Sequence, residues 1–143
     1  MSGVPFPGEY FKLINLNVIA RLDAALRPLG LTTAQSDLLC FLDQRGGAET
    51  TVQDIGTHFH LKHPTVVGIV HRLEDKGFVS TAVSPRDRRC RIVRLTLRFD
   101  EVRRVMSNHR ALLDERSTRG FTDGELLRLR DMLERVYQNV RMD

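Results

Sequence analysis

The sequence has few of the features on which secreted, membrane-bound or catalytic proteins depend. Two cysteines, Cys40 and Cys90, are too few for a disulfide framework. No apolar run approaches the length of a membrane span and the first ten residues show no signal peptide, so we expect a cytoplasmic protein without membrane contact. The one glycine doublet, Gly46-Gly47, has no phosphate-loop context, and no nucleophile is paired with a base. We therefore expect no enzyme.

Lysine is also scarce, because 19 of the 22 basic residues are arginines. Eight arginines and three acidic residues lie between Arg86 and Arg104, which gives this segment a formal charge of +5, while the whole chain carries +4. Positive charge focused on one segment is typical of a phosphate-binding surface. The same composition also fits a solvated edge or a surface for an acidic protein partner, so the local structure must decide.

The stretch from Leu61 to Leu97 predicts a helix followed by a two-stranded wing. Pro64 and Gly77 are start and stop signals for the helix. Apolar residues at helical spacing predict its buried face, namely Val66, Ile69, Val70 and Leu73. The opposite face is small or polar, with Thr65, Val67, Gly68, His71 and Arg72. Such a face can enter the major groove of DNA, which admits one helix.

The wing is predicted from two short β-branched runs joined by an arginine-rich turn, Ser84 to Arg89. In the second run, the alternation of Val93, Leu95 and Leu97 with polar residues predicts one buried face. Cys90 lies among arginines, whose charge would lower the pKa of its thiol, so a redox-sensing role and an inert strand position both fit.

Helices are expected on both sides of this stretch. Residues 9–27 are apolar around most of the predicted helix, which favours a face shared with a second subunit. Capping boxes predict three further helix starts, formed by Thr32 with Gln35, Thr51 with Asp54, and Thr122 with Glu125. Another helix is expected from Phe99 to about Arg119. The helix after Thr51, a tight turn over 61–63 and the next helix together form a helix-turn-helix.

Histidines near the turn leave an alternative open. His58, His60 and His63, with Asp54 one helical turn before His58, suit zinc, but they fit equally well as phosphate donors or solvated residues. His109 lies on an apolar face and is expected to pack in the core or at a dimer contact.

In this order, the elements resemble the MarR (multiple antibiotic resistance regulator) family of winged-helix transcription factors. The matching residues are Leu31-Thr32 with Gln35, Thr65-Val66, Arg72-Leu73-Glu74, Lys76-Gly77-Phe78-Val79, Asp87-Arg88-Arg89 and Leu95-Thr96. The resemblance implies a mainly α fold with a small β-wing, in a single domain over 1–143. Residues 31–97 would form the winged helix-turn-helix lobe, and 1–30 and 98–143 the dimerisation helices.

The resemblance also implies a function and its residues. It implies a homodimeric repressor that binds a pseudo-palindromic site in double-stranded DNA, needs no cofactor and responds to a small aromatic effector. The DNA contacts would be Lys62, His63, Thr65, Val67, Gly68, Arg72, Arg86, Arg88 and Arg89, with Asp87 orienting the wing. Phe11, Asn15, Phe41 and His109 would line the effector pocket. The rival interpretations are a metal- or redox-responsive regulator of this fold and a winged-helix module that binds a protein.

The sequence departs from the family pattern at three places. Val67 and Gly68 replace the Ser and Arg that are usual in the middle of the recognition helix, which leaves fewer donors for base hydrogen bonds. His63 stands where Ser is more common at the start of that helix. Arg98-Phe99-Asp100 replaces Glu-Lys-Gly, so the course of the chain beyond the wing is uncertain from sequence.

Overall fold

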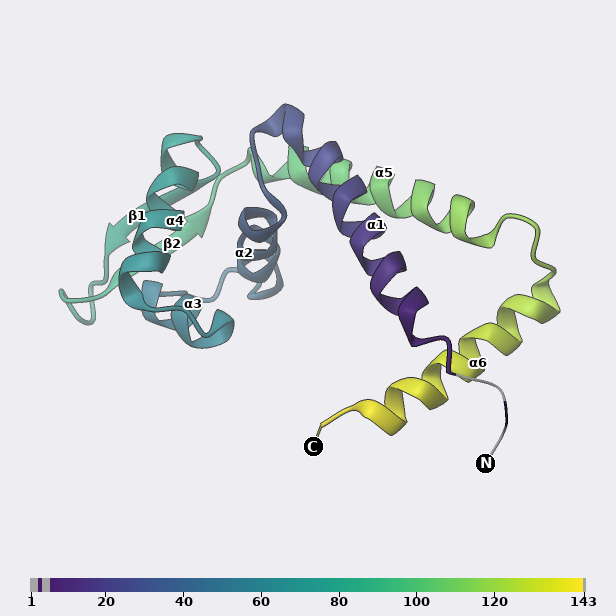
Figure 1. Ribbon diagram of the computed structural model, residues 1–143. Helices are drawn as coiled ribbons and strands as arrows, with labels where there is room; N and C mark the ends of the chain where they lie inside the picture. The colour runs from purple at the N-terminus through teal and green to yellow at the C-terminus, as the bar shows by residue number, and fades with distance from the viewer. Residues whose placement is uncertain (1–2, 4–5, 143) are drawn as a thin grey trace. The chain divides into compact units, whose positions relative to one another are not determined.

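The computed structural model describes Gly3 and residues 6–142. These residues form helices and one hairpin in the order α1 (Gly8–Leu26), the 3-10 turn η1 (Arg27–Leu29), α2 (Thr33–Gln44), α3 (Val52–Phe59), α4 (His63–Asp75), β1 (Val79–Val83), β2 (Arg91–Leu95), α5 (Phe99–Thr118) and α6 (Asp123–Val140) (Figure 1). The expected mainly α fold with a small β-wing is confirmed. Part of the segment on which the signal-peptide expectation depends lies outside the described residues.

The chain divides into two compact units, one that ends at His109 and one that begins at Arg110. The first contains the elements from α1 to β2 and the first half of α5, and the second contains the rest of α5 and α6. Among the described residues, no helix combines the length and the apolar character that crossing a membrane requires.

All three predicted capping boxes are present. The hydroxyl oxygens of Thr32, Thr51 and Thr122 each accept a hydrogen bond from the backbone N–H three residues later, at 3.2, 3.1 and 3.2 Å. In each case the side chain of that later residue accepts from the backbone N–H of the threonine. These bonds satisfy N–H groups that have no partner inside the helix, which fixes where α2, α3 and α6 begin.

The buried face of α4 follows the predicted stripe. Val66, Val70 and Leu73 are buried and Ile69 is half-buried. The helix begins at His63, one residue earlier than Pro64 suggests, and Lys62 is its N-cap residue. It ends at Asp75, and Gly77 follows the C-cap residue Lys76 with a φ of 80°, which is accessible to glycine at little cost and lets the Phe78 N–H bond back to the Leu73 carbonyl.

The hairpin pairs Val79 with Leu95 and Val83 with Arg91 in antiparallel register. A third segment lies along β2, because the Val93 N–H donates to the Thr50 carbonyl at 2.8 Å and Thr51 forms a bridge with Ile92. Ile92 and Val93 are both buried, so the burial along β2 does not alternate strictly.

The prediction for Leu97 was wrong. Its side chain is 90% exposed, since β2 ends at Leu95 and residues 97–98 form the turn into α5. Thr96 ends the strand, because its hydroxyl donates to the Gly77 carbonyl at 2.6 Å.

The helices α1 and α6 leave most of their apolar side chains exposed. On α1 the exposed ones are Tyr10, Phe11, Leu13, Ile14, Leu16 and Ile19, and on α6 they are Leu127, Met132, Leu133, Tyr137 and Val140. Leu26 is the one fully buried residue of α1, and no described residue of α6 is fully buried. The apolar face of each of these two helices is therefore not covered within the unit to which the helix belongs.

Candidate nucleic-acid interface

The outward face of α4 is smooth over its first two turns. His63 and Thr65 are exposed, Val67 is 42% exposed and Gly68 is half-buried. A Cβ built on Gly68 would meet no atom within 4 Å, so the helix backbone itself forms the surface there. The structure therefore places the small outward side chains predicted from sequence on one accessible face.

Lys62 and Arg72 lie at the two ends of this face. Lys62 is the N-cap residue and Arg72 lies in the last turn, and both side chains are exposed. His71 was not among the predicted contacts. It is exposed next to Arg72 in the chain, and its Nε2 lies 3.4 Å from an Asp75 carboxylate oxygen.

The loop between β1 and β2 is shaped by two polar side chains. The Ser84 hydroxyl accepts from the backbone N–H groups of Arg86 and Asp87, at 3.2 and 3.4 Å. The Asp87 carboxylate accepts from the backbone N–H of Arg89 at 3.0 Å and from its guanidinium at 3.2 Å. These bonds lower the pKa of Asp87, so the carboxylate is charged at neutral pH. Asp87 therefore holds the side chain of Arg89 in one direction.

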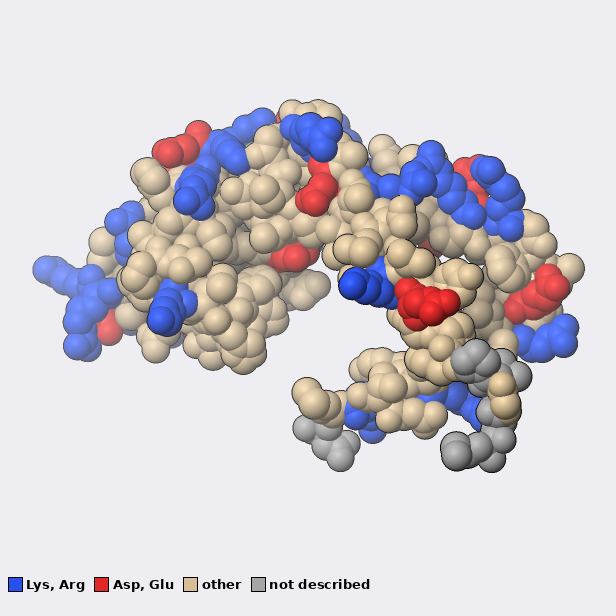
Figure 2. All heavy atoms as spheres, in the orientation of Figure 1, with Lys and Arg blue, Asp and Glu red and all other residues tan. Residues whose placement is uncertain are grey.

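Arg86, Arg88 and Arg89 project from the tip of this hairpin. All three are exposed, and neither Arg86 nor Arg88 has a carboxylate within 4.0 Å among the described residues. Figure 2 shows one group of basic side chains at the hairpin, with other basic side chains spread over the helices. The charge focus predicted from sequence is therefore carried by a protruding loop, where few carboxylates offset it.

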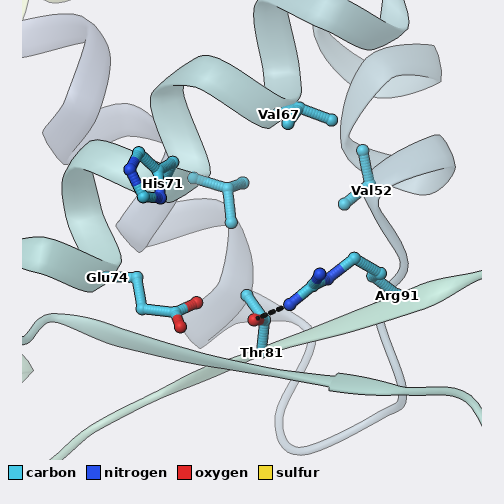
Figure 3. A pocket seen from close by; sticks show the side chains of 7 residues that line it. Val52, Val67, His71, Glu74, Thr81 and Arg91 are labelled. Carbon is cyan, nitrogen blue, oxygen red and sulfur yellow. Dashed lines mark hydrogen bonds between the residues drawn. The ribbon is translucent and has the colours of Figure 1, made fainter.

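A cleft of about 150 Å³ separates α4 from the hairpin. His71 and Glu74 line it from α4, Thr81 and Arg91 from the strands (Figure 3). The Arg91 guanidinium donates to the Thr81 hydroxyl at 2.7 Å. A second hollow of about 370 Å³ adjoins it and shares Val52, Val67 and Arg91. Arg91 was not among the predicted contacts, although strand alternation places its side chain on the other face of β2 from the buried Ile92.

The expected effect of the arginines on Cys90 was wrong. Cys90 precedes β2 and is half-buried, and its sulfur lies 3.7 Å from an Asp87 carboxylate oxygen. Desolvation and then the charge of Asp87 raise the pKa of the thiol, and these two effects outweigh the nearby Arg89. A raised thiol pKa does not favour redox sensing.

The histidines are used in separate ways. The His58 ring stacks on Phe41, with ring centroids 4.0 Å apart, and His60 ends α3 with a left-handed φ of 54°. His63 is the first residue of α4. Over Gly3 and residues 6–142, no three His, Cys, Asp or Glu side chains are grouped so that they could hold a metal ion. The metal-responsive alternative therefore lacks a ligand set in this part of the chain.

The four residues predicted to line an effector pocket lie on three helices. Phe11 is 40% exposed on α1, with Asn15 exposed one turn later. Phe41 on α2 is half-buried in an aromatic cluster with His58 and Phe59, and His109 on α5 is half-buried. The two hollows beside α4 are lined by other residues.

Arg98 settles the course of the chain beyond the wing. Its guanidinium donates to the Lys76 carbonyl, lies 4.4 Å from the centroid of the Phe78 ring and pairs with Glu101 at 2.9 Å. The turn into α5 is therefore fastened to the end of α4.

Known proteins are similar to this chain in sequence and in fold. Residues 29–89 match the model of the MarR family. The HTH-type transcriptional repressor IacR of Pseudomonas putida is 30% identical over 136 residues, which cover 94% of this chain and 80% of that protein.

Solved structures of similar fold cover nearly the whole chain. The apo form of wild-type MarR from E. coli has a TM-score of 0.74 at 24% identity, over 94% of this chain and 98% of that one. YusO from Bacillus subtilis has a TM-score of 0.79 at 21% identity, over 92% of each chain. A mutant of S. aureus MepR bound to an oligodeoxyribonucleotide has a TM-score of 0.73 at 20% identity, over 96% of this chain and 100% of that one. Together with the match to IacR, these findings show that the chain belongs to the MarR family of winged helix-turn-helix transcriptional regulators.

Proposed function

We propose that this protein is a ligand-responsive repressor that binds a pseudo-palindromic DNA operator as a homodimer. The observation that carries this proposal is the pairing, within one compact unit, of a smooth exposed α4 face with an arginine-tipped hairpin. A helix of this kind reads base edges in the major groove, while arginines on a wing contact phosphates or a narrow minor groove.

Two relatives support the same direction. IacR is a transcriptional repressor by name, and MepR has been solved with an oligodeoxyribonucleotide. Carried onto this chain, Lys62, Arg86 and Arg88 contact phosphates or the minor groove, and Arg89 is aimed by Asp87. The residues nearest the base edges are Thr65, Val67 and Gly68.

The homodimer is supported by the apolar faces that neither unit covers by itself. Ile14 on α1 is 60% exposed, and Tyr137 and Val140 on α6 are 59% and 68% exposed. Burying such side chains against a second copy contributes about 25 cal/mol per Å² of apolar surface. A two-fold dimer presents two α4 helices to two half-sites about one helical turn of DNA apart.

The proposal also includes a small aromatic ligand that regulates DNA binding. Such a ligand would bind more tightly to a dimer whose two α4 helices are spaced too widely for the two half-sites. It weakens DNA binding only by the difference between its affinities for this conformation and for the DNA-binding one. Phe41 is already packed against His58, so Phe11, Asn15 and His109 are the better candidates for contact with an aromatic ligand.

The proposal is tested by binding of the purified protein to the DNA upstream of its own gene. We expect binding that weakens steeply as salt rises, a footprint with two related half-sites, and two protein chains in each complex. Absence of binding at low ionic strength would overturn the proposal. Binding to an acidic protein with no footprint on DNA would instead establish the protein-interaction alternative.

A further inference from the structure

We infer that Val67 is a specificity-determining residue that recognises thymine through its 5-methyl group. This inference rests on the proposed function and adds the chemistry by which α4 chooses its bases. It follows from the surface that α4 presents where a recognition helix lies closest to the bases, in its first two turns.

The major groove offers three kinds of contact, namely acceptors, donors and the thymine methyl group. Arginine, asparagine and glutamine distinguish bases by paired hydrogen bonds, but the outward face of α4 between His63 and His71 has none of these residues. The thymine methyl is the one groove feature that an aliphatic side chain can distinguish. The apolar part of this face therefore selects for methyl groups.

Val67 is placed to make such a contact. Its side chain is 42% exposed and ends in two methyl groups with no polar atom. The neighbouring Gly68 has no side chain, and no other side chain fills the space where its Cβ would lie. A base edge can approach this part of the helix closely without meeting a bulky side chain.

The other residues of the face are less selective. The Thr65 hydroxyl both donates and accepts, so it suits any base. His63 and Lys62 lie at the helix start, where a phosphate is the expected neighbour. Val67 is thus the one residue of the face whose only favourable contact is with an apolar group.

The test measures the affinity of the protein for its operator after single thymines are replaced by deoxyuridine. This change removes the methyl group and leaves every hydrogen-bonding atom in place. We expect one thymine position in each half-site where the loss of a methyl weakens binding about fourfold, the factor that corresponds to one buried methyl or methylene group. Placing 5-methylcytosine there should bind more tightly than cytosine by a similar factor.

A matched variant identifies Val67 as the reader. Val67→Ser replaces both methyl groups by a single hydroxyl, and the two residues have similar helix propensity, so fold and dimer mass should be retained. In this variant, the thymine-to-deoxyuridine affinity ratio at that position should fall to about one. Arg88→Ala serves as the control, because it should weaken binding to both DNAs and leave the ratio unchanged.

The outcomes separate this inference from the proposed function. Failure to bind DNA at all would overturn the proposed function. Binding with no methyl-sensitive thymine, or with the same ratio in the wild-type protein and in Val67→Ser, would overturn the inference alone. If Val67→Ser proved misfolded by circular dichroism, Val67→Ala would replace it in the same comparison, with an expected ratio below that of the wild-type protein because both γ-methyl groups are absent.

Discussion

The two compact units differ in how much of their apolar surface they bury by themselves. Every fully buried hydrophobic residue of the described chain lies in the unit that ends at His109, and the other unit contributes none. In α6, the apolar residues follow a helical stripe as regular as that of α4, yet Leu133 and Tyr137 remain 43% and 59% exposed. The apolar stripe of α4 is buried by other elements of its own unit, whereas the apolar stripe of α6 is not buried within its unit.

Local signals do not distinguish the two units. The capping box of Thr51 in the first unit and that of Thr122 in the second have nearly the same geometry, with hydrogen bonds of 3.1 and 3.2 Å. The units differ in whether their apolar side chains are buried within the unit. The comparison therefore predicts that the buried residues of the first unit respond to core substitutions, whereas the apolar face of α6 in the second unit responds to substitutions that affect association.

The largest effect is expected in the core of the first unit. Phe78 is fully buried and its ring packs under the Arg98 guanidinium. Phe78→Ala should lower the free energy of unfolding by about 3–5 kcal/mol, because it removes buried apolar surface and leaves a cavity. Urea denaturation measures this, with Leu97→Ala as the exposed control expected within about 0.5 kcal/mol of wild type. A loss below about 1 kcal/mol for Phe78→Ala would contradict the assigned core.

The next effect concerns the apolar face of α6. If this face packs against a second copy, Leu133→Glu places a carboxylate in the interface and should convert the dimer to a monomer in sedimentation. DNA binding should weaken at least about tenfold, which corresponds to about 1.4 kcal/mol. Met142→Glu, at a position 95% exposed, is the control. A Leu133→Glu protein that remains dimeric would remove α6 from the interface.

A smaller effect compares the two caps directly. Thr51→Ala and Thr122→Ala should each reduce stability by about 1 kcal/mol, since each leaves a backbone N–H without its acceptor. Hydrogen exchange should show that the loss at Thr122 diminishes as protein concentration rises, because association stabilises α6, whereas the loss at Thr51 should vary less. Equal dependence on concentration at both sites would break the comparison between the units.

The smallest effect concerns the contact between the Asp87 carboxylate and the Cys90 thiol in the hairpin loop. Hydrogen bonds from Arg89 lower the pKa of Asp87, so its carboxylate is charged throughout the neutral range, where desolvation and the charge of Asp87 keep the pKa of the Cys90 thiol raised. Cys90 should therefore react with iodoacetamide more slowly than a free cysteine at pH 7.5, and Asp87→Asn should accelerate the reaction by about twofold to fivefold. No acceleration would show that Asp87 does not control this thiol.

Much of the fold was predictable because short-range chemistry determines it. The boundaries of α2, α3 and α6 follow from threonine hydroxyls three residues before a Gln, Asp or Glu, and the end of α4 follows from Gly77. Such contacts lie within a few residues of one another, so a sequence pattern contains all the partners. The hairpin and its arginines were predictable for the same reason.

The errors arose where distant or opposing contacts decide. Leu97 continues the alternation of β2, but the Thr96 hydroxyl is held by Gly77, nineteen residues away, and the strand ends before Leu97. Cys90 lies among arginines in sequence, but the side chain that its sulfur contacts is Asp87. Neighbours in sequence gave the charge composition of the loop but not the direction in which each side chain points.

The most direct test of the account is the salt dependence of operator binding by wild type and by Arg88→Ala. If the hairpin arginines contact phosphates, the substitution should weaken binding to different sequences by a similar factor, and the slope of log affinity against log salt concentration should become shallower by about one. Arg130→Ala, which removes the same charge from α6, should leave that slope unchanged. An unchanged slope and affinity for Arg88→Ala would contradict the claim that this hairpin grips DNA.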